Sequence, residues 1–243
     1  CGSHGGTHTG TDGSSAQSIE DLAIYRSLPN MVVMHPSDDI STEILTSKLL
    51  DLKSPSYTRT ARNKTPRIYA KGDSRIEIGK GVELRDGSDV AIIACGVMVS
   101  KSLEAAELLS EKGIEATVVD MHTIKPLDEE LVKRLAAECK LIVTVEDHSV
   151  IGGLGGAVAE YLSENIPTRL RRVGVRDRFG ESGQAEEMLE LLNISTNDII
   201  NSVLEIKGIE NSESEEYSGL NLITIAAIGF VIFTIFAVRM RRT

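Results

Sequence analysis

The sequence predicts an α/β protein made of two α/β units with mainly parallel sheets, followed by one C-terminal transmembrane helix. Short apolar runs of strand length alternate with longer amphipathic segments, two of which begin at acidic residues, Asp38 and Asp128, and one of which ends at Gly113. A stretch rich in Lys, Gly and Asp interrupts this alternation, and a more regular one follows it. The chain then closes with an uncharged apolar run of membrane-spanning length.

Composition limits the partners that the chain can have. Its 243 residues are 41% hydrophobic, which suits one or two globular domains. The formal net charge of -10 disfavours a polyanion-binding surface, so we expect no nucleic acid partner. The three cysteines Cys1, Cys95 and Cys139 are odd in number and form no CxxC pair. We therefore expect free thiols in a reducing compartment and no metal site.

The first unit is expected over residues 1–70. It opens with a glycine-dense polar loop, and the segments after it alternate between helix and strand patterns. The acidic pair Asp38-Asp39 caps the second helix, so strand, cap and helix form a βα unit. The expected elements are a helix over about 18–28, a strand over 31–34, a helix from Asp38 to about Leu52 and a strand over 56–60.

A linker or small hairpin is expected over residues 71–88, and the second unit over 89–207. Near-continuous apolar runs in the second unit indicate strands that are covered on both faces, which is typical of a doubly wound sheet. We expect strands over 90–95, 116–120, 141–145 and 170–175, and helices over about 98–112, 128–139, 152–162, 184–192 and 195–207.

The loop over residues 1–17 is the first candidate site. Its glycines let the backbone take positive φ and approach a ligand closely, while His4, His8 and Asp12 supply titratable side chains. Composition leaves two other interpretations open, a disordered start or the remnant of an expression tag that contains Gly-Ser-His. Because the chain begins with Cys1 directly at this loop, we expect a fragment that lacks its beginning.

Three further features lie at strand ends or at a helix start. Arg62 follows the strand over 56–60, where ligands gather in open α/β sheets, although a surface ion pair is the commoner role. Glu146-Asp147-His148 ends another strand and suits either acid–base chemistry or the anchoring of loops, and anchoring is favoured. The glycine run 152–156 suits a phosphate cradle or tight helix packing, and packing is favoured because GxGxxG spacing and a P-loop lysine are absent.

Two sets of motifs carry a family resemblance. The first unit contains Cys1-Gly2-Ser3-His4, Gly10-x-Asp12-Gly13, Ile19-Glu20-Asp21-Leu22-Ala23, Arg26, Pro29-Asn30 and Pro36-Ser37-Asp38. The second contains Thr123-Ile124-Lys125-Pro126-Leu127-Asp128, Thr144-Val145-Glu146-Asp147-His148, Gly152-Gly153 and Arg178-Phe179-Gly180-Glu181-Ser182-Gly183. In order and spacing these resemble the second half of the pyrimidine-binding domain of transketolase and its C-terminal domain, together over residues 1–207.

The match of the whole loop argues against the tag remnant. Deoxyxylulose phosphate synthase and the β subunits of 2-oxo acid dehydrogenases share both domain types, but the Glu-Asp-His and Arg-Phe-Gly-Glu-Ser-Gly stretches favour transketolase. The resemblance implies part of a split, archaeal-type transketolase. Such an enzyme transfers a two-carbon ketol unit between sugar phosphates in the pentose phosphate pathway, using thiamine diphosphate and Mg²⁺.

The resemblance also implies roles for individual residues. His4 and Arg62 match residues that contact the phosphate end of the substrate, and Asp12 matches an acid that hydrogen-bonds a substrate hydroxyl. Arginine suits this task because its forked donors fit phosphate oxygens. Gln17 and His8 are further candidates. Ala16 departs from the family pattern, in which histidine or glutamine bonds the reacting end of the substrate.

No catalytic residue is expected in this chain. In the family, a glutamate upstream of the loop protonates the aminopyrimidine ring, and the diphosphate and metal ligands belong to another domain. We therefore expect cofactor binding mainly by an N-terminal transketolase subunit or domain, a homodimer or heterotetramer, and little activity of the isolated chain. The alternative is a non-catalytic, membrane-anchored assembly subunit with the same fold.

The tail predicts a membrane anchor. Residues 208–219 form an acidic spacer, and residues 220–238 are uncharged and long enough to cross the hydrocarbon core. Arginines after this run favour an inside C-terminus, whereas sugar phosphates and free cysteines favour a cytoplasmic catalytic part. The expected location is a single-pass, membrane-anchored protein with its catalytic part in the cytoplasm.

Overall fold

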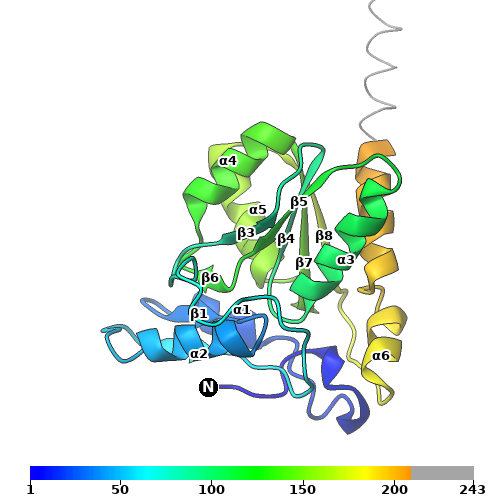
Figure 1. Cartoon of the computed structure of the whole chain (residues 1–243). Helices are drawn as coiled ribbons and strands as arrows, with labels where there is room; N and C mark the ends of the chain where they lie inside the picture. Colours follow the sequence, from blue (N-terminus) through cyan, green and yellow to red (C-terminus); the bar gives the residue numbers. More distant parts are fainter. Residues whose placement is uncertain (209–243) are drawn as a thin grey trace, which may run out of the picture. The chain divides into compact units, whose positions relative to one another are not determined.

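Two mixed sheets organise residues 1–208, the part of the chain that the computed structural model describes (Figure 1). In the smaller sheet, β1 (Val32–Met34) lies between β2 (Ser56–Thr58), which is parallel to it, and β6 (Thr123–Lys125), which is antiparallel. Helices α1 (Asp21–Ser27) and α2 (Asp39–Lys48) precede and follow β1. Because β6 comes from the later part of the chain, the first and second predicted units share this sheet.

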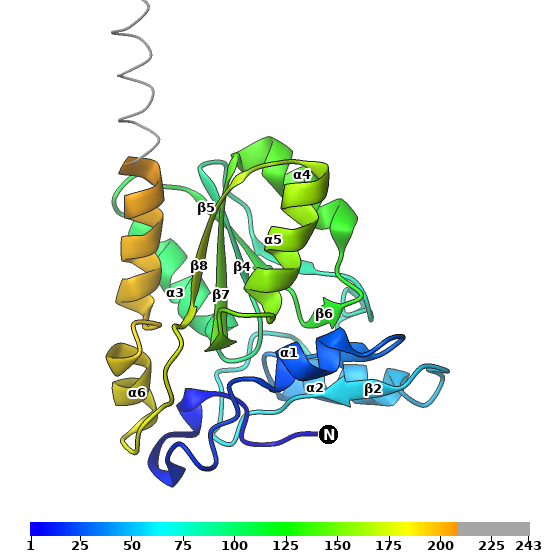
Figure 2. The same cartoon turned by 180° about the vertical axis from the view of Figure 1, so that it is seen from behind.

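The larger sheet has the strand order β3-β5-β4-β7-β8. Its last four strands in this order pair in parallel, and β3 joins the edge antiparallel to β5. Helix α3 covers one face, and α4 and α5 cover the other (Figures 1 and 2). The bounds are β3 Val82–Arg85, β4 Val90–Ala94, α3 Met98–Ser110, β5 Ala116–Asp120, α4 Glu129–Cys139, β7 Leu141–Ser149, α5 Leu154–Asn165, β8 Arg169–Val175 and α6 Ala185–Leu191, and a last helix begins at residue 196.

Two strands differ from the sequence prediction. Strand β3 lies within the segment predicted as a linker or hairpin, and β6 was not predicted as a strand. Both are short and lack a continuous apolar run, so only pairing with β5 and β1 makes them strands. As a result each sheet has one antiparallel edge strand, although the larger sheet stays mainly parallel, as predicted. Residues 1–203 form one compact unit, which is not divided at the predicted boundaries near residues 70 and 88. These boundaries stay predictions.

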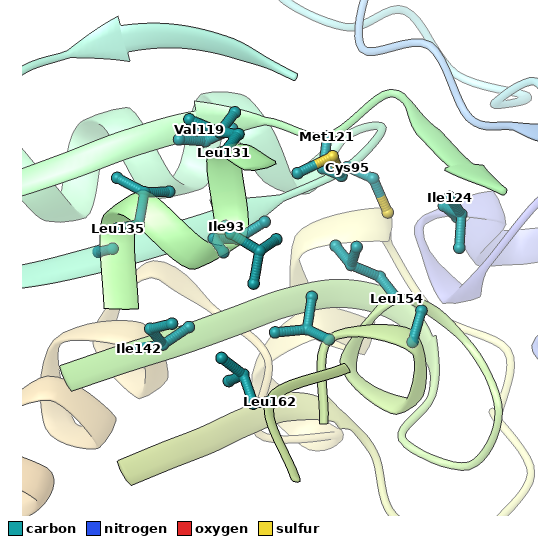
Figure 3. Packing of buried hydrophobic residues seen from close by; sticks show 14 of the residues in the cluster. Ile93, Cys95, Val119, Met121, Ile124, Leu131, Leu135, Ile142, Leu154 and Leu162 are labelled. Carbon is teal, nitrogen blue, oxygen red and sulfur yellow. The ribbon is translucent and has the colours of Figure 1, made fainter. Parts of the chain in front are cut away.

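The core lies between the larger sheet and helices α4 and α5 (Figure 3). Ile93, Val119 and Ile142 from three neighbouring strands are fully buried there, against Leu135 and Leu154 from the two helices. Strands β4 and β5 are buried along their whole length, as expected when helices cover both faces of a parallel sheet. This packing fixes the strand ends at which the polar residues described below gather.

The prediction of a membrane-anchored, single-pass protein is corrected by the structure. Within residues 1–208 no helix is both long and apolar enough to cross a membrane. An α-helix needs about 20 apolar residues for this, whereas α3 has 13 residues and packs against the sheet. The run 220–238, on which the prediction rested, lies outside the described residues.

Candidate functional site at the opening loop

The opening loop lies between β2 and the C-terminal end of β7. Gly2 forms a parallel bridge with Arg59, so the first residues extend the smaller sheet. The loop then forms the 3-10 helix η1 (Thr7–Asp12), which packs beside α6 (Figures 1 and 2). Gly10 within η1 has φ 75°, a left-handed conformation that glycine adopts without strain. The loop is therefore ordered by contacts with both units and is not a disordered start.

Three sequence-predicted site residues, two from this loop and one from the segment after β2, come together. The Nε2 atom of His4 lies 3.5 Å from Oδ2 of Asp12, and Nε of Arg62 forms an ion pair with the same oxygen. The side chains of His4 and Arg62 are each 40% exposed and that of Asp12 is 29% exposed. The His4 ring and the Arg62 guanidinium thus lie beside one carboxylate at a position that solvent, and hence a ligand, can reach.

This cluster can bind a polar, anionic ligand. The Arg62 guanidinium uses Nε for Asp12 and donates from Nη1 to Asn63 Oδ1 at 3.3 Å, a long and exposed hydrogen bond. Its remaining donors and the His4 ring suit the oxygens of a phosphate group. The Asp12 carboxylate suits a ligand hydroxyl, and it also aligns the two donors before a ligand arrives.

Gln17, a further candidate, lies apart from this cluster and is buried. Its Nε2 atom donates to the backbone oxygens of Gly10 at 3.2 Å and Glu181 at 2.9 Å. The amide therefore joins the opening loop to the segment before α6. Its suggested contact with the substrate stays a prediction. Ala16, the preceding residue, brings no polar group to the site.

His8 also lies apart from the cluster of His4, Asp12 and Arg62. It borders a cavity of about 640 Å³ between residues 64–68 and helix α3. His4, Asp12 and Arg62 do not line this cavity. Its Nδ1 atom is buried without a hydrogen-bond partner. A role for His8 in substrate binding stays a prediction.

The buried residues Glu146 and Asp147 anchor backbone segments on either side of β7. Asp147 accepts hydrogen bonds from the backbone N–H groups of Thr7 and His8. Glu146 accepts from the first N–H groups of α5, at 2.8 Å in each case. Burial raises the pKa of Glu146 to about 7. These contacts support the anchoring interpretation of the Glu-Asp-His motif.

The glycine run 152–156 allows close packing around Glu146. The carboxylate of Glu146 already occupies the N-terminus of α5, where a phosphate cradle would place its anion. A Cβ atom on Gly153 would lie 2.0 Å from Glu146 Oε2. The glycines therefore serve close packing, the role that the sequence analysis favoured over a phosphate cradle, because the Glu146 carboxylate already fills the helix start.

Gly153→Ala is expected to lower the free energy of unfolding by about 1–3 kcal/mol, because the added methyl group forces Glu146 away from the helix start. The matched control is Gly156→Ala in the same run, where the added Cβ would meet nothing closer than 3.5 Å. That change should be neutral or stabilising by up to about 1 kcal/mol through helix propensity. Urea unfolding of both variants measures the difference, and equal costs would contradict the packing role.

Sequence reasoning missed a buried ion pair beneath the loop. Arg59 is fully buried, its Nε atom lies 3.3 Å from Oδ2 of Asp21, and its Nη2 donates to the backbone oxygens of Ser18 and Asp147. The Tyr57 hydroxyl donates to the same Asp21 oxygen at 2.6 Å. The only signal in the sequence was an arginine inside a short strand pattern, which does not distinguish burial from exposure.

The described residues do not supply a site for a metal-bound diphosphate. Among residues 1–208, no group of three or more His, Cys, Asp or Glu side chains could hold a metal ion. The pair of stacked aromatic rings near the loop, Tyr25 and Tyr57, pack on each other with centroids 3.8 Å apart. The residues that the structure describes therefore do not fit a metal-bound diphosphate.

Two sequence families match the chain in tandem. The pyrimidine-binding domain of transketolase matches residues 1–67, and the C-terminal domain of transketolase matches residues 79–199. A putative transketolase C-terminal section from Methanocaldococcus jannaschii is 45% identical over 204 residues, covering 83% of this chain and 64% of the relative. The subunit SqwH of a 6-deoxy-6-sulfo-D-fructose transketolase from a Clostridium species is 41% identical over 210 residues, with 86% and 65% covered.

A solved structure has the same fold. It is described as a split gene transketolase, an inactive beta4 tetramer, and it superimposes with a TM-score of 0.78 and 43% identity over 84% of this chain and 65% of that chain. The chain thus spans just under two thirds of the length of these relatives. Two consecutive domain matches, the shared fold and relatives above 40% identity show that the chain belongs to the transketolase family.

Proposed function

We propose that this chain is the sugar-phosphate-binding part of a transketolase, which transfers a two-carbon ketol unit between sugar phosphates. The observation that carries the proposal is the convergence of His4 and Arg62 on Asp12 at an accessible position. Arg62 and His4 bind the phosphate, and Asp12 accepts a hydrogen bond from a substrate hydroxyl. Together they hold the substrate at the end that does not react.

The cofactor is held elsewhere in this proposal. Members of the transketolase family use thiamine diphosphate, which supplies the carbanion chemistry of ketol transfer when it is bound. The described residues lack a metal cluster for the diphosphate. The catalytic glutamate, the aromatic residues around the aminopyrimidine ring and the ligands of Mg²⁺ therefore come from an N-terminal transketolase subunit or domain.

Assembly with that partner makes the chain active. The relative described as an inactive beta4 tetramer supports the view that copies of such a chain associate without forming a working site. A homodimer of complete subunits or a heterotetramer of both kinds of subunit fits the proposal. By itself, the chain should show little ketol transfer.

Ala16 motivates a second candidate function, a non-catalytic assembly subunit. At this position of the loop the side chain is a methyl group without hydrogen-bonding capacity, and the amide of the neighbouring Gln17 already donates to backbone oxygens.

The chain is also related to 1-deoxy-D-xylulose-5-phosphate synthases, whose names state another sugar phosphate product. A catalytic component of that kind is therefore a further alternative.

A ketol-transfer assay distinguishes these functions. The full-length gene product is mixed with its N-terminal partner, thiamine diphosphate and Mg²⁺, and pairs of ketose and aldose phosphates are offered. We expect transfer only when both proteins are present. Absence of transfer with every pair, although the two proteins form a complex, would favour the assembly subunit, and formation of 1-deoxy-D-xylulose 5-phosphate would favour the synthase.

A further inference from the structure

Asp147 makes a dense set of contacts with the opening loop from the other side of the fold. Its carboxylate is fully buried at the end of β7. Oδ1 accepts hydrogen bonds from the backbone N–H and the hydroxyl of Thr7, both at 2.7 Å. Oδ2 accepts from the backbone N–H of His8 at 2.8 Å. One side chain thereby binds three donors at the start of η1.

The loop is shaped to receive this carboxylate. Gly6 has φ 81°, and a Cβ atom at this position would lie 2.2 Å from Oδ2 of Asp147. Any side chain there would push the carboxylate away from the N–H groups that it binds. The glycine and the aspartate, far apart in sequence, are therefore matched to each other.

The backbone of Asp147 ties down the far end of the same loop. Its carbonyl oxygen accepts a hydrogen bond from Nη2 of the buried Arg59 at 2.9 Å, and that Nη2 also donates to the carbonyl of Ser18 at 2.6 Å. The N–H of Gly6 donates to the same Ser18 oxygen at 2.7 Å. Both ends of the segment that contains Asp12 are thus fixed around Asp147.

We propose that Asp147 is a positioning residue for the sugar-phosphate pocket, which holds the opening loop so that Asp12 and His4 meet Arg62. The effect on substrate binding rests on the proposed function. The anchoring of the loop by Asp147 does not, because it follows from the hydrogen bonds alone. Asp147 touches no substrate in this scheme and acts only through the loop.

The adjacent Glu146 provides a matched control. Both carboxylates are fully buried at the end of the same strand, but Glu146 binds the N–H groups of Leu154 and Gly155 at the start of α5. Removing either charge disturbs the interior. Only the removal at Asp147 releases the loop.

The first experiment compares Asp147→Asn and Glu146→Gln in the active complex. In Asp147→Asn one amide oxygen still accepts hydrogen bonds, while the NH₂ group faces a backbone donor. We expect the KM for a sugar phosphate to rise about fivefold to tenfold, with a smaller change in kcat and in the KM for an unphosphorylated ketose. Glu146→Gln should leave the ratio of the two KM values as in the wild type. An unchanged ratio in Asp147→Asn, or an equal shift in both variants, overturns the proposal.

A second variant covers the case in which Asp147→Asn does not fold. Thr7→Val removes the hydroxyl that donates to Oδ1 and keeps the buried carboxylate and both backbone bonds. It should shift the same KM ratio in the same direction by a smaller factor. In a His4→Ala background the shift should shrink, because the loop then has less to position. Full additivity with His4→Ala argues against action through the loop.

Hydrogen exchange separates this proposal from the proposed function, because it needs no activity. In the full-length protein, Asp147→Asn should accelerate exchange of the Thr7 and His8 amides about tenfold or more relative to the wild type. Glu146→Gln should accelerate exchange at Leu154 and Gly155 instead. If the wild-type complex transfers no ketol unit, the proposed function fails while this comparison still tests the anchor. Unchanged exchange at Thr7 and His8 in Asp147→Asn overturns the anchor.

Discussion

Arg62→Ala is expected to raise the KM for sugar phosphates about ten- to a hundredfold, with little change in the KM for an unphosphorylated ketose. A charge-assisted hydrogen bond contributes roughly 1.5–3 kcal/mol, and every 1.4 kcal/mol changes an equilibrium about tenfold. Arg62 is exposed enough to meet a ligand and is already aligned by Asp12. Steady-state kinetics of the complex with its N-terminal partner, on both kinds of substrate, measures the effect.

Two further variants sharpen this test. Arg62→Lys keeps the positive charge but lacks the paired N–H donors of the guanidinium, so it should retain only part of the affinity for sugar phosphates. Arg134→Ala removes an arginine that pairs with Glu83 and Glu138 on the surface, and it should leave both KM values unchanged. Equal losses for phosphorylated and unphosphorylated substrates in Arg62→Ala would remove Arg62 from the phosphate site.

Arg59→Met is expected to have the largest effect on stability, a loss of about 3–5 kcal/mol in the free energy of unfolding. Methionine fills much of the volume but leaves the buried Asp21 carboxylate without its cation. It also removes the donor that the carbonyl groups of Ser18 and Asp147 share. Urea unfolding of the wild type and the variant measures the loss.

The control for this prediction is an arginine whose ion pair lies on the surface. Arg67 pairs with Asp39, and their side chains are 65% and 60% exposed. Arg67→Ala should cost no more than about 1 kcal/mol, because exposed ion pairs contribute little. In the double variant Arg59→Met with Asp21→Asn, part of the lost stability should return, since no unpaired charge stays buried. A cost for Arg59→Met as small as that for Arg67→Ala would contradict the buried pair.

Much of the fold could be predicted from local patterns. The strands of the second unit, such as 90–94 and 116–120, are largely apolar runs, and burial on both faces leaves that mark in the sequence. β3 and β6 carry no such mark, because edge pairing and pairing across the two units make them strands. The predicted membrane anchor rested on the apolar run 220–238, which lies outside the described residues, and no helix within residues 1–208 is long and apolar enough to cross a membrane.

The neighbourhood of the candidate residues agrees with the sequence prediction, whereas their support was not predicted. The family resemblance named His4, Asp12 and Arg62 as candidates, and the fold places all three side chains together. Their role in binding stays a prediction. Arg59 and Arg62 lie three positions apart with the same chemistry, so nothing local tells the buried arginine from the exposed one. Their roles differ only because strand pairing directs Arg59 towards Asp21 and leaves Arg62 at the surface.

The sequence by itself determined most of the alternation of strands and helices and the family resemblance, since these follow from residue type and spacing. Only the tertiary structure decided which carboxylates of the Glu-Asp-His motif anchor which segment. Asp147 meets Thr7 across 140 positions of sequence, and Glu146 turns to the start of α5. Adjacent residues in a strand point to opposite faces, so their partners depend on what the fold packs against each face.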